Sequence, residues 1–236
     1  MRILVVNPNT TASMTRKIGE AARRVASPGT EIIALNPKSG PASIEGYYDE
    51  AISLAGLLQV VHDNPTVDAI VIACFDDTGL DAVRCIADHP VVGIGEAAFH
   101  FASMLANKFS VVTTLARSVP AIEHNLHRYG LASRCARVRS TEVAVLDLEH
   151  NAGPARNKIN AEFKCAMSDD RAEAIVLGCA GMTDLTESLA AEHGLPVLDG
   201  VSCAIMLCEG LVRLKLSTSH RGGYARASIK DRSKAS

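Results

Sequence analysis

Short apolar runs alternate with helix-length stretches along almost the whole chain. Each run is continuously apolar, as in a strand that is buried on both faces of a parallel sheet. The runs are Ile3–Val6, Ile32–Leu35, Ala69–Ala73, Val91–Ile94, Ser110–Val112, Ala174–Leu177 and Val197–Leu198. Between the runs, apolar residues recur at the spacing of one helix face, as Met14, Ile18 and Ala22 do after the first. The alternation predicts an α/β fold with mostly parallel sheets and right-handed crossovers.

The chain also contains an internal repeat. Ala69–Leu80 aligns without a gap with Ala174–Leu185 at an offset of 105 residues, which places Cys74 on Cys179. Two more matches occur in the same order, with one further residue of offset: Pro90–Gly93 with Pro196–Asp199, and Val5–Asn7 with Val111–Thr113. One match between short apolar strands can arise by chance, but three in order with a cysteine in register indicate a duplicated unit.

We therefore expect two pseudo-symmetric α/β lobes, each a mostly parallel sheet flanked by helices, with a ligand cleft between them. The first lobe is predicted to comprise residues 1–97 together with 206–219, and the second residues 98–205. Over 220–236 apolar residues are scarce and basic residues predominate, so a flexible basic tail is predicted there.

Composition and charge limit the partners. The 236 residues include 24 Lys and Arg against 26 Asp and Glu, a net charge of −2, so a nucleic-acid partner is not expected. No apolar run is long enough to span a bilayer and the first residues lack a signal-peptide core, so we expect no membrane association and a cytoplasmic location. In that compartment the seven cysteines are expected to be thiols rather than disulfides.

Two of the cysteines are placed where they can react. Cys74 and Cys179 each follow a buried strand and precede a polar turn and a helix. Open parallel sheets bind ligands at the carboxyl ends of their strands. N–H groups at a helix start favour a thiolate and lower the thiol pKa from about 8.5, which we expect for both residues. The other five are expected to be packing or bystander residues: Cys85, Cys135, Cys165, Cys203 and Cys208.

A pair of opposed thiols can racemise a carbon centre. One thiolate removes a proton from one face of the carbon, and the thiol on the other side returns a proton to the opposite face. Backbone N–H groups at the helix starts can hold the oxyanion that develops next to that carbon. Such a reaction uses the two thiols alone, so neither a metal nor a cofactor is predicted.

Other chemistries fit the sequence less well. The chain has no Cys-x-x-Cys and no His-Glu-x-x-His, the spacings of dithiol exchange and of common zinc sites. Gly93-Ile94-Gly95 is an incomplete nucleotide-binding fingerprint. Gly178–Gly181 is similar to a nucleophile elbow with Cys in place of Ser, which would make a thiol esterase or amidase but would leave Cys74 unused. The non-enzymatic alternative is a two-lobed small-molecule-binding protein.

Four blocks of the sequence carry a family resemblance. They are Val5–Thr11, Ile44–Gly46, Ala73–Asp77 and Val176–Met182. In this order they resemble the hydantoin racemases of the cofactor-independent aspartate/glutamate/hydantoin racemase family, over residues 1–219. The resemblance implies D/L interconversion of 5-monosubstituted hydantoins, a homo-oligomer and two catalytic cysteines. By matched position Cys74 would act on the D form and Cys179 on the L form.

Two positions depart from related patterns. Ala180-Gly181 stands where the amino-acid racemases of the family typically have Thr-His, which implies a ring substrate without a free α-carboxylate. Thr78 stands where hydantoin racemases usually have Pro. Allantoin racemase shares most of the pattern, so it and other proton-transfer enzymes of the superfamily stay as alternatives.

Further residues are expected to line the cleft. Asn7 and Asn9 follow the first strand, and Thr113 and Thr114 follow its counterpart in the repeat. Capping of the next turn or helix is an equally good role for these four side chains. The family blocks add a second group of expected substrate-binding residues: Glu45, Gly46, Phe75, Asp76, Gly178, Ala180 and Gly181.

Overall fold

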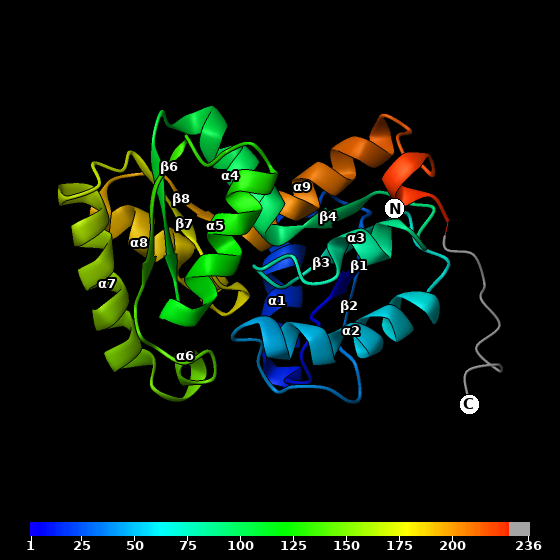
Figure 1. Cartoon of the computed structure of the whole chain (residues 1–236), viewed down its shortest axis with the longest axis horizontal. Helices are drawn as coiled ribbons and strands as arrows, with labels where there is room; N and C mark the ends of the chain where they lie inside the picture. Colours follow the sequence, from blue (N-terminus) through cyan, green and yellow to red (C-terminus); the bar gives the residue numbers. More distant parts are fainter. Residues whose placement is uncertain (227–236) are drawn as a thin grey trace.

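Two parallel four-stranded sheets with the same strand order form the framework of the computed structural model, which describes residues 1–226 except the side chain of Glu149 (Figure 1). The first sheet has the order β2-β1-β3-β4 and the second β6-β5-β7-β8. The strands are β1 Arg2–Val6, β2 Glu31–Leu35, β3 Ala69–Ile72, β4 Val91–Gly93, β5 Phe109–Thr113, β6 Cys135–Ser140, β7 Ala174–Leu177 and β8 Val197–Asp199. Every pairing within them is parallel. The predicted pair of pseudo-symmetric α/β lobes is therefore confirmed.

Apart from the edge strand β6, the strands are mostly apolar because helices cover both faces of each sheet. In β1, Ile3 and Val5 pack into a core that lies between the sheets, while Leu4 and Val6 pack into a second core on the outer face. The second sheet repeats this arrangement, with its outer core built around Phe163. Successive strand side chains point to opposite faces, so both sets of residues must be apolar.

The helices form an outer layer on each sheet and a shared layer between the sheets (Figure 1). The outer helices are α2 Tyr47–His62 and α3 Leu80–Arg84 in the first lobe, and α6 Asp147–His150, α7 Ala152–Ser168 and α8 Thr186–His193 in the second. The inner helices are α1 Ala12–Val25, α4 Ile94–Leu105, α5 Val119–Arg128 and α9 Gly200–Arg213. Short 3₁₀ turns span Ala116–Ser118, Ala180–Leu185 and Gly222–Tyr224.

The two lobes share their inner helices. Helix α4, which follows the last strand of the first sheet, contacts β7 and β8 of the second. Helix α9, which follows the last strand of the second sheet, contacts β3 and β4 of the first. The two helices also pack against each other, so one continuous apolar core joins the sheets. This shared core fixes where the strand ends of one lobe face those of the other.

Strand β6 is the one strand that the apolar pattern did not predict. Its sequence, Cys-Ala-Arg-Val-Arg-Ser, carries two arginines, and of its side chains only Val138 is buried. An edge strand has one neighbour and tolerates charge on its open side, so it lacks the continuous apolar pattern of the central strands.

The first part of the predicted basic tail is bound to the first lobe. His220 contacts Asp88, and the Tyr224 hydroxyl donates to Asp81 at 3.0 Å. The rest of the predicted tail, residues 227–236, lies outside the described residues. Within the described part of the chain, no helix has the length and hydropathy needed to cross a bilayer.

Candidate active site

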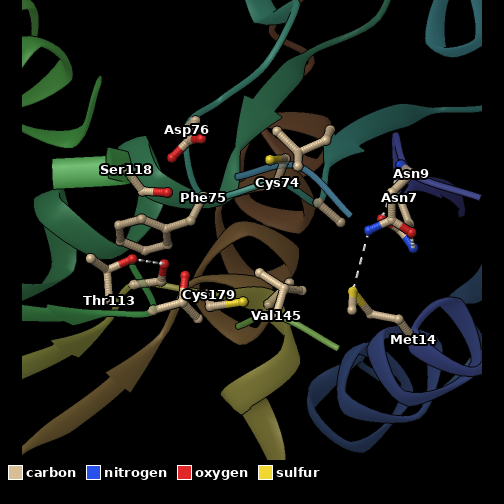
Figure 2. Close-up of a pocket in the computed structure, with 15 residues that line it drawn as sticks. Asn7, Asn9, Met14, Cys74, Phe75, Asp76, Thr113, Ser118, Val145 and Cys179 are labelled. Atoms are coloured by element: carbon tan, nitrogen blue, oxygen red, sulfur yellow. Dashed lines mark hydrogen bonds between the residues drawn. The ribbon is translucent and has the colours of Figure 1, made fainter. Parts of the chain in front are cut away.

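The two matched cysteines face one cavity between the lobes. β3 ends at Ile72, two residues before Cys74, and β7 ends at Leu177, two residues before Cys179. Both strands are central in their sheets, so each cysteine emerges from the middle of a sheet edge. Figure 2 shows the two side chains on opposite sides of the cavity. The lining consists of Asn7, Asn9, Met14, Ile44, Ala73, Cys74, Phe75, Asp76, Thr113, Thr114, Ser118, Val145, Gly178, Cys179 and Ala180.

The cavity is narrow and has a mixed lining. Its volume of about 30 Å³ is room for roughly one or two water molecules. Amide and hydroxyl groups alternate around it with apolar side chains, and Asp76 is the one carboxyl group among the lining residues. A small ring with polar edges matches this chemistry, provided that the walls separate to admit it.

The expected low thiol pKa values are not found. Burial raises the pKa of Cys179 to about 11, and the Gly181 N–H and the Lys17 charge oppose that rise only in part. Burial and the nearby Asp76 charge hold the pKa of Cys74 well above its usual range, although the Thr78 hydroxyl donates to its sulfur. The thiol pKa values are high because loss of hydration in a closed cavity disfavours the thiolate more than a few N–H and O–H donors stabilise it.

Asp76 has an unusual environment. Burial, then the neighbouring Glu50 and Asp77 carboxyl groups, raise the pKa of Asp76 to about 8. Its carboxyl faces that of Glu50, and Glu50 Oε1 is buried without a hydrogen-bond donor among the described residues. The side chain lies on the same side of the cavity as Cys74 (Figure 2). Near neutral pH, Asp76 can therefore hold a proton and donate a hydrogen bond.

Asn7 and Asn9 line the cavity and also stabilise their own turn. Asn7 Nδ2 donates to Asn9 Oδ1 at 2.9 Å and to Thr15 Oγ1 at 3.0 Å. Asn9 Oδ1 also accepts from the Thr11 N–H, and its Nδ2 contacts the Met14 sulfur. Both expected roles thus coexist: the two amides hold the turn after β1 and present their remaining surface to the cavity.

The second lobe contributes Thr113, Thr114 and Gly178 to the cavity lining. Thr113 Oγ1 donates to the Gly178 carbonyl at 2.9 Å, and the Thr114 carbonyl accepts from Thr141. A Cβ at Gly178 would lie 2.7 Å from the Thr113 Cβ, so this position accepts only glycine at the present strand spacing. Phe75 and Ala180, which follow the two cysteines, also line the cavity.

Three predicted binding residues are not among the lining residues. Glu45 accepts from the Val145 N–H and pairs with Arg117, which ties the two lobes together. Gly46 is the N-cap residue before helix α2 and has a φ of 144°, a backbone conformation that favours glycine. The Gly181 N–H donates toward the Cys179 sulfur, and its carbonyl accepts from Lys17.

Five lining residues were not predicted as site residues: Met14, Ile44, Ala73, Ser118 and Val145. Met14 was predicted only as part of an apolar helix face, and Ile44 and Ala73 belong to the segments of family resemblance but were not predicted to bind substrate. Ser118 and Val145 come from segments after β5 and β6 that carry no strand-end signal. Only the tertiary fold brings these two residues to the cavity.

The glycine fingerprint has another use in the structure. Asp77 accepts from the N–H groups of Gly95 and Glu96 at 2.9 and 2.8 Å, at the start of helix α4. A carboxylate thus occupies the position that a phosphate would take at a nucleotide-binding helix. Across residues 1–226, no group of three or more His, Cys, Asp or Glu side chains is arranged to hold a metal ion.

Comparison with known proteins points to one family. The family described as Asp/Glu/Hydantoin racemase matches residues 3–208. A hydantoin racemase of Pseudomonas sp. (strain NS671) is 45% identical over 226 residues, which is 95% of this chain and 91% of that protein. The solved allantoin racemase from Klebsiella pneumoniae is 46% identical, with a TM-score of 0.95 over 98% of this chain and 95% of its own. The allantoin racemase from Pseudomonas fluorescens is 44% identical, with the same TM-score and 98% of each chain covered.

Proposed function

The chain belongs to the Asp/Glu/hydantoin racemase family, and from this membership we propose that it racemises 5-monosubstituted hydantoins without a cofactor. Cys74 and Cys179 are the two bases of the proposed reaction. The observation that carries the proposal is their placement on opposite sides of one cavity, at matched ends of two matched strands.

In the proposed reaction, one proton is removed from C5 of the ring and another is added to its opposite face. A thiolate on one side removes the proton from C5 of the ring, and the electron pair passes to the adjacent carbonyl oxygen as an enolate. The thiol on the other side then donates its proton to the opposite face of C5, and the enolate returns to the carbonyl. Each turnover exchanges the roles of the two sulfurs, so the same site serves both directions.

Residues around the sulfurs support these steps. The Thr78 hydroxyl and the Gly181 N–H each donate toward one sulfur, which stabilises the thiolate form of Cys74 and of Cys179 in turn. Protonated Asp76 offers a donor to an oxygen or ring nitrogen of the substrate. Asn7, Asn9 and the other predicted residues of the lining would hold the ring edges.

The charge of the lining favours a ring over a free amino acid. The cavity has no Lys or Arg among its lining residues, so an α-carboxylate would have no cationic partner there. A buried anion without a partner is strongly unfavourable. A hydantoin carries its carbonyl within a neutral ring and needs only hydrogen bonds.

Allantoin is the second candidate substrate. It is itself a hydantoin with a ureido group at C5, and the allantoin racemase from Klebsiella pneumoniae is as similar to this chain as the hydantoin racemase from Pseudomonas. The amides of Asn7 and Asn9 and the Ser118 hydroxyl could bind a ureido group, whereas Met14, Ile44 and Val145 suit an alkyl group.

Three broader features belong to the same proposal. The protein acts in the cytoplasm, it assembles with copies of itself, and its lobes divide as 1–97 with 206–219 and 98–205. A two-lobed protein that binds such a ring without converting it is the outcome that the next experiment separates from catalysis.

The test uses single enantiomers in D2O. L-5-isobutylhydantoin and one enantiomer of allantoin are each incubated with the protein, and optical rotation and deuterium at C5 are followed against a protein-free blank. Catalysis predicts loss of rotation together with deuterium uptake, and the faster substrate identifies the side-chain preference. Binding without either change would contradict the proposal.

Cysteine variants test the mechanism in the same assay. Cys74→Ser and Cys179→Ser are each expected to lower kcat/KM about 10²–10⁴-fold, the usual contribution of a general acid or base. Cys165→Ser on helix α7, outside the lining, is the matched control and should keep its activity. Unchanged rates in both cavity variants would exclude the two-thiol mechanism.

A further inference from the structure

Each cysteine-bearing turn is held by a side chain from the opposite lobe. Lys17 Nζ, on helix α1 of the first lobe, donates to the Gly181 carbonyl at 3.0 Å. Asn125 Nδ2, on helix α5 of the second lobe, donates to the Asp76 carbonyl at 2.8 Å. Gly181 lies two residues beyond Cys179, and Asp76 lies two residues beyond Cys74.

The two hydrogen bonds reach matched backbone positions of the internal repeat from corresponding helices. Asp76 and Gly181 occupy the same position when the Cys74 and Cys179 blocks are aligned. Helices α1 and α5 also correspond, because each follows the first strand of its sheet in chain order. We call the pair of side chains, Lys17 and Asn125, the cross-lobe braces.

Other contacts strengthen each brace. Lys17 also pairs with Asp184 at 3.0 Å, on the same 3₁₀ turn as Gly181. On the other side, the Tyr129 hydroxyl donates to Asp77 at 2.7 Å, one residue beyond Asp76. The position of each sulfur is thus set partly by a helix of the lobe that faces it.

The braces differ in charge. Lys17 carries an ammonium group that lowers the pKa of Cys179, whereas the amide of Asn125 is neutral. The charged groups that bear on Cys179 are Lys17, Asp76 and Glu45, and the ones that bear on Cys74 are Asp76 and the other thiol. Asp184 shares the ammonium, but its side chain is 44% exposed against 23% for Lys17, so water screens it more.

We propose that Lys17 and Asn125, on corresponding helices, are positioning residues for the two thiols, and that the charge present only on Lys17 makes Cys179 the more readily ionised thiol of the free enzyme. This inference rests on the proposed function, since it assigns starting states to the two bases. Burial raises the pKa of both thiols, and Lys17, which opposes that rise, bears on Cys179.

The consequence concerns the state of the free enzyme after turnover. When Cys179 has taken a proton and Cys74 has given one, the negative charge is on the sulfur that lacks a cationic brace. Return of the proton from Cys179 to Cys74, directly or through solvent, restores the favoured state. Lys17 therefore biases which enantiomer finds its own cysteine in the thiolate form.

Thiol alkylation tests the charge of Lys17 without requiring turnover. Initial rates of iodoacetamide modification are measured at each cysteine by peptide-resolved mass spectrometry, as a function of pH. In the unmodified protein, Cys179 is expected to react at lower pH than Cys74. Lys17→Met should raise the pH midpoint of Cys179 by roughly half a unit or more, because an opposite charge nearby is lost.

Matched variants separate charge from position. Lys17→Arg keeps the cation, so its Cys179 midpoint should lie close to that of the unmodified protein. A purely structural effect of replacing Lys17 would raise the midpoint in both variants. Lys158→Met, on helix α7, also removes an ammonium that donates to a backbone carbonyl, here that of Glu142, and should leave both midpoints unchanged. Asn125→Ala should lower kcat while leaving the Cys179 midpoint in place.

The results can also overturn the proposal. Reaction of Cys74 before Cys179, or equal midpoints in Lys17→Met and Lys158→Met proteins with native circular dichroism, would contradict it. A protein that shows the predicted alkylation pattern but racemises no hydantoin would keep the resting-state assignment and reject the proposed function instead.

Discussion

The backbone N–H of Val145 donates to Glu45 Oε1 at 2.9 Å, and this bond joins the two lobes at the cavity wall. Ile44, the neighbour of Glu45, lines the cavity from the first lobe, and Val145 lines it from the second. Arg117 pairs with the second carboxylate oxygen. This carboxylate holds two walls of the cavity together. Because the cavity is narrow, these walls must move apart for a substrate to enter.

Replacement of Glu45 should therefore affect both stability and substrate binding. Glu45→Ala leaves the buried Val145 N–H without its acceptor, which costs about 1–3 kcal/mol of unfolding free energy. Glu45→Gln keeps an oxygen for that N–H and loses only the pairing with Arg117, whose side chain is 61% exposed, so its cost should stay below about 1 kcal/mol. Urea unfolding and KM are measured for both.

The control for this pair is Glu142→Ala. Glu142 also accepts a backbone N–H, that of Ala116, but both residues are exposed and water can replace the carboxylate. Equal losses of stability in Glu45→Ala and Glu142→Ala would contradict the role assigned to the buried bond.

Asp76 should make stability fall as pH rises. Its pKa is raised in the folded protein, so the folded chain holds a proton that the unfolded chain releases above the ordinary aspartate pKa of 3.8. The associated stability is full below that value and is lost as pH rises through about 8. Asp76→Asn cannot ionise, and its amide supplies the donor that Glu50 Oε1 lacks.

The Asp76→Asn protein is therefore expected to become more stable than the unmodified protein as the pH rises. The gain in unfolding free energy should reach on the order of 2 kcal/mol at pH 8, after allowance for the partial exposure of Asp76. Urea titrations at pH 5 and pH 8 measure it. Asp63→Asn, at the exposed end of helix α2, is the control for the same substitution outside the cavity. A gain that is the same at both pH values would disagree with the raised pKa.

Two glycines should respond in opposite directions to the same substitution. At Gly178 an added Cβ would lie 2.9 Å from the Thr113 Cα, a backbone atom that cannot move without shifting β5. Gly178→Ala should therefore lower both stability and activity, since Cys179 is the next residue. At Gly210, inside helix α9, an added Cβ meets nothing within 4 Å.

Gly210→Ala should raise stability by about 0.5–1 kcal/mol, because alanine loses less backbone entropy in a helix. Thermal unfolding of the two variants beside the unmodified protein provides the comparison. A stabilised Gly178→Ala protein with full activity would show that the strands can separate freely at this point.

The sequence predicted the framework because the framework follows local rules. Continuous apolar runs separated by helix-length stretches can fold in few ways, and the repeat placed Cys74 and Cys179 at equivalent strand ends. The thiol pKa values were predicted wrongly because burial is a property of the tertiary fold. A helix start is visible in a sequence, whereas the loss of water around a sulfur is not.

The cavity walls were harder to predict for the same reason. Ser118 and Val145 come from segments that have no periodic pattern, and they reach the cavity only because the second lobe turns its strand ends toward the first. Glu45 was expected to bind substrate, but its carboxylate is engaged by Val145 and Arg117. A charged residue near a site gives no local sign of whether it faces the ligand or the opposite lobe.

Single-cysteine variants should divide the two enantiomers between them. With one thiol replaced by serine, the remaining thiolate can still remove the C5 proton on its own side and return a deuteron from solvent without inversion. In the proposed mechanism, Cys74 acts on the D form and Cys179 on the L form. Cys179→Ser protein in D2O should therefore label D-5-isobutylhydantoin at C5 while its optical rotation persists, and Cys74→Ser should label only the L form.

Nuclear magnetic resonance follows the C5 proton, and chiral chromatography follows the configuration. Labelling of both enantiomers by each variant would mean that a single thiol reaches both faces, and the opposed geometry would then have no catalytic role.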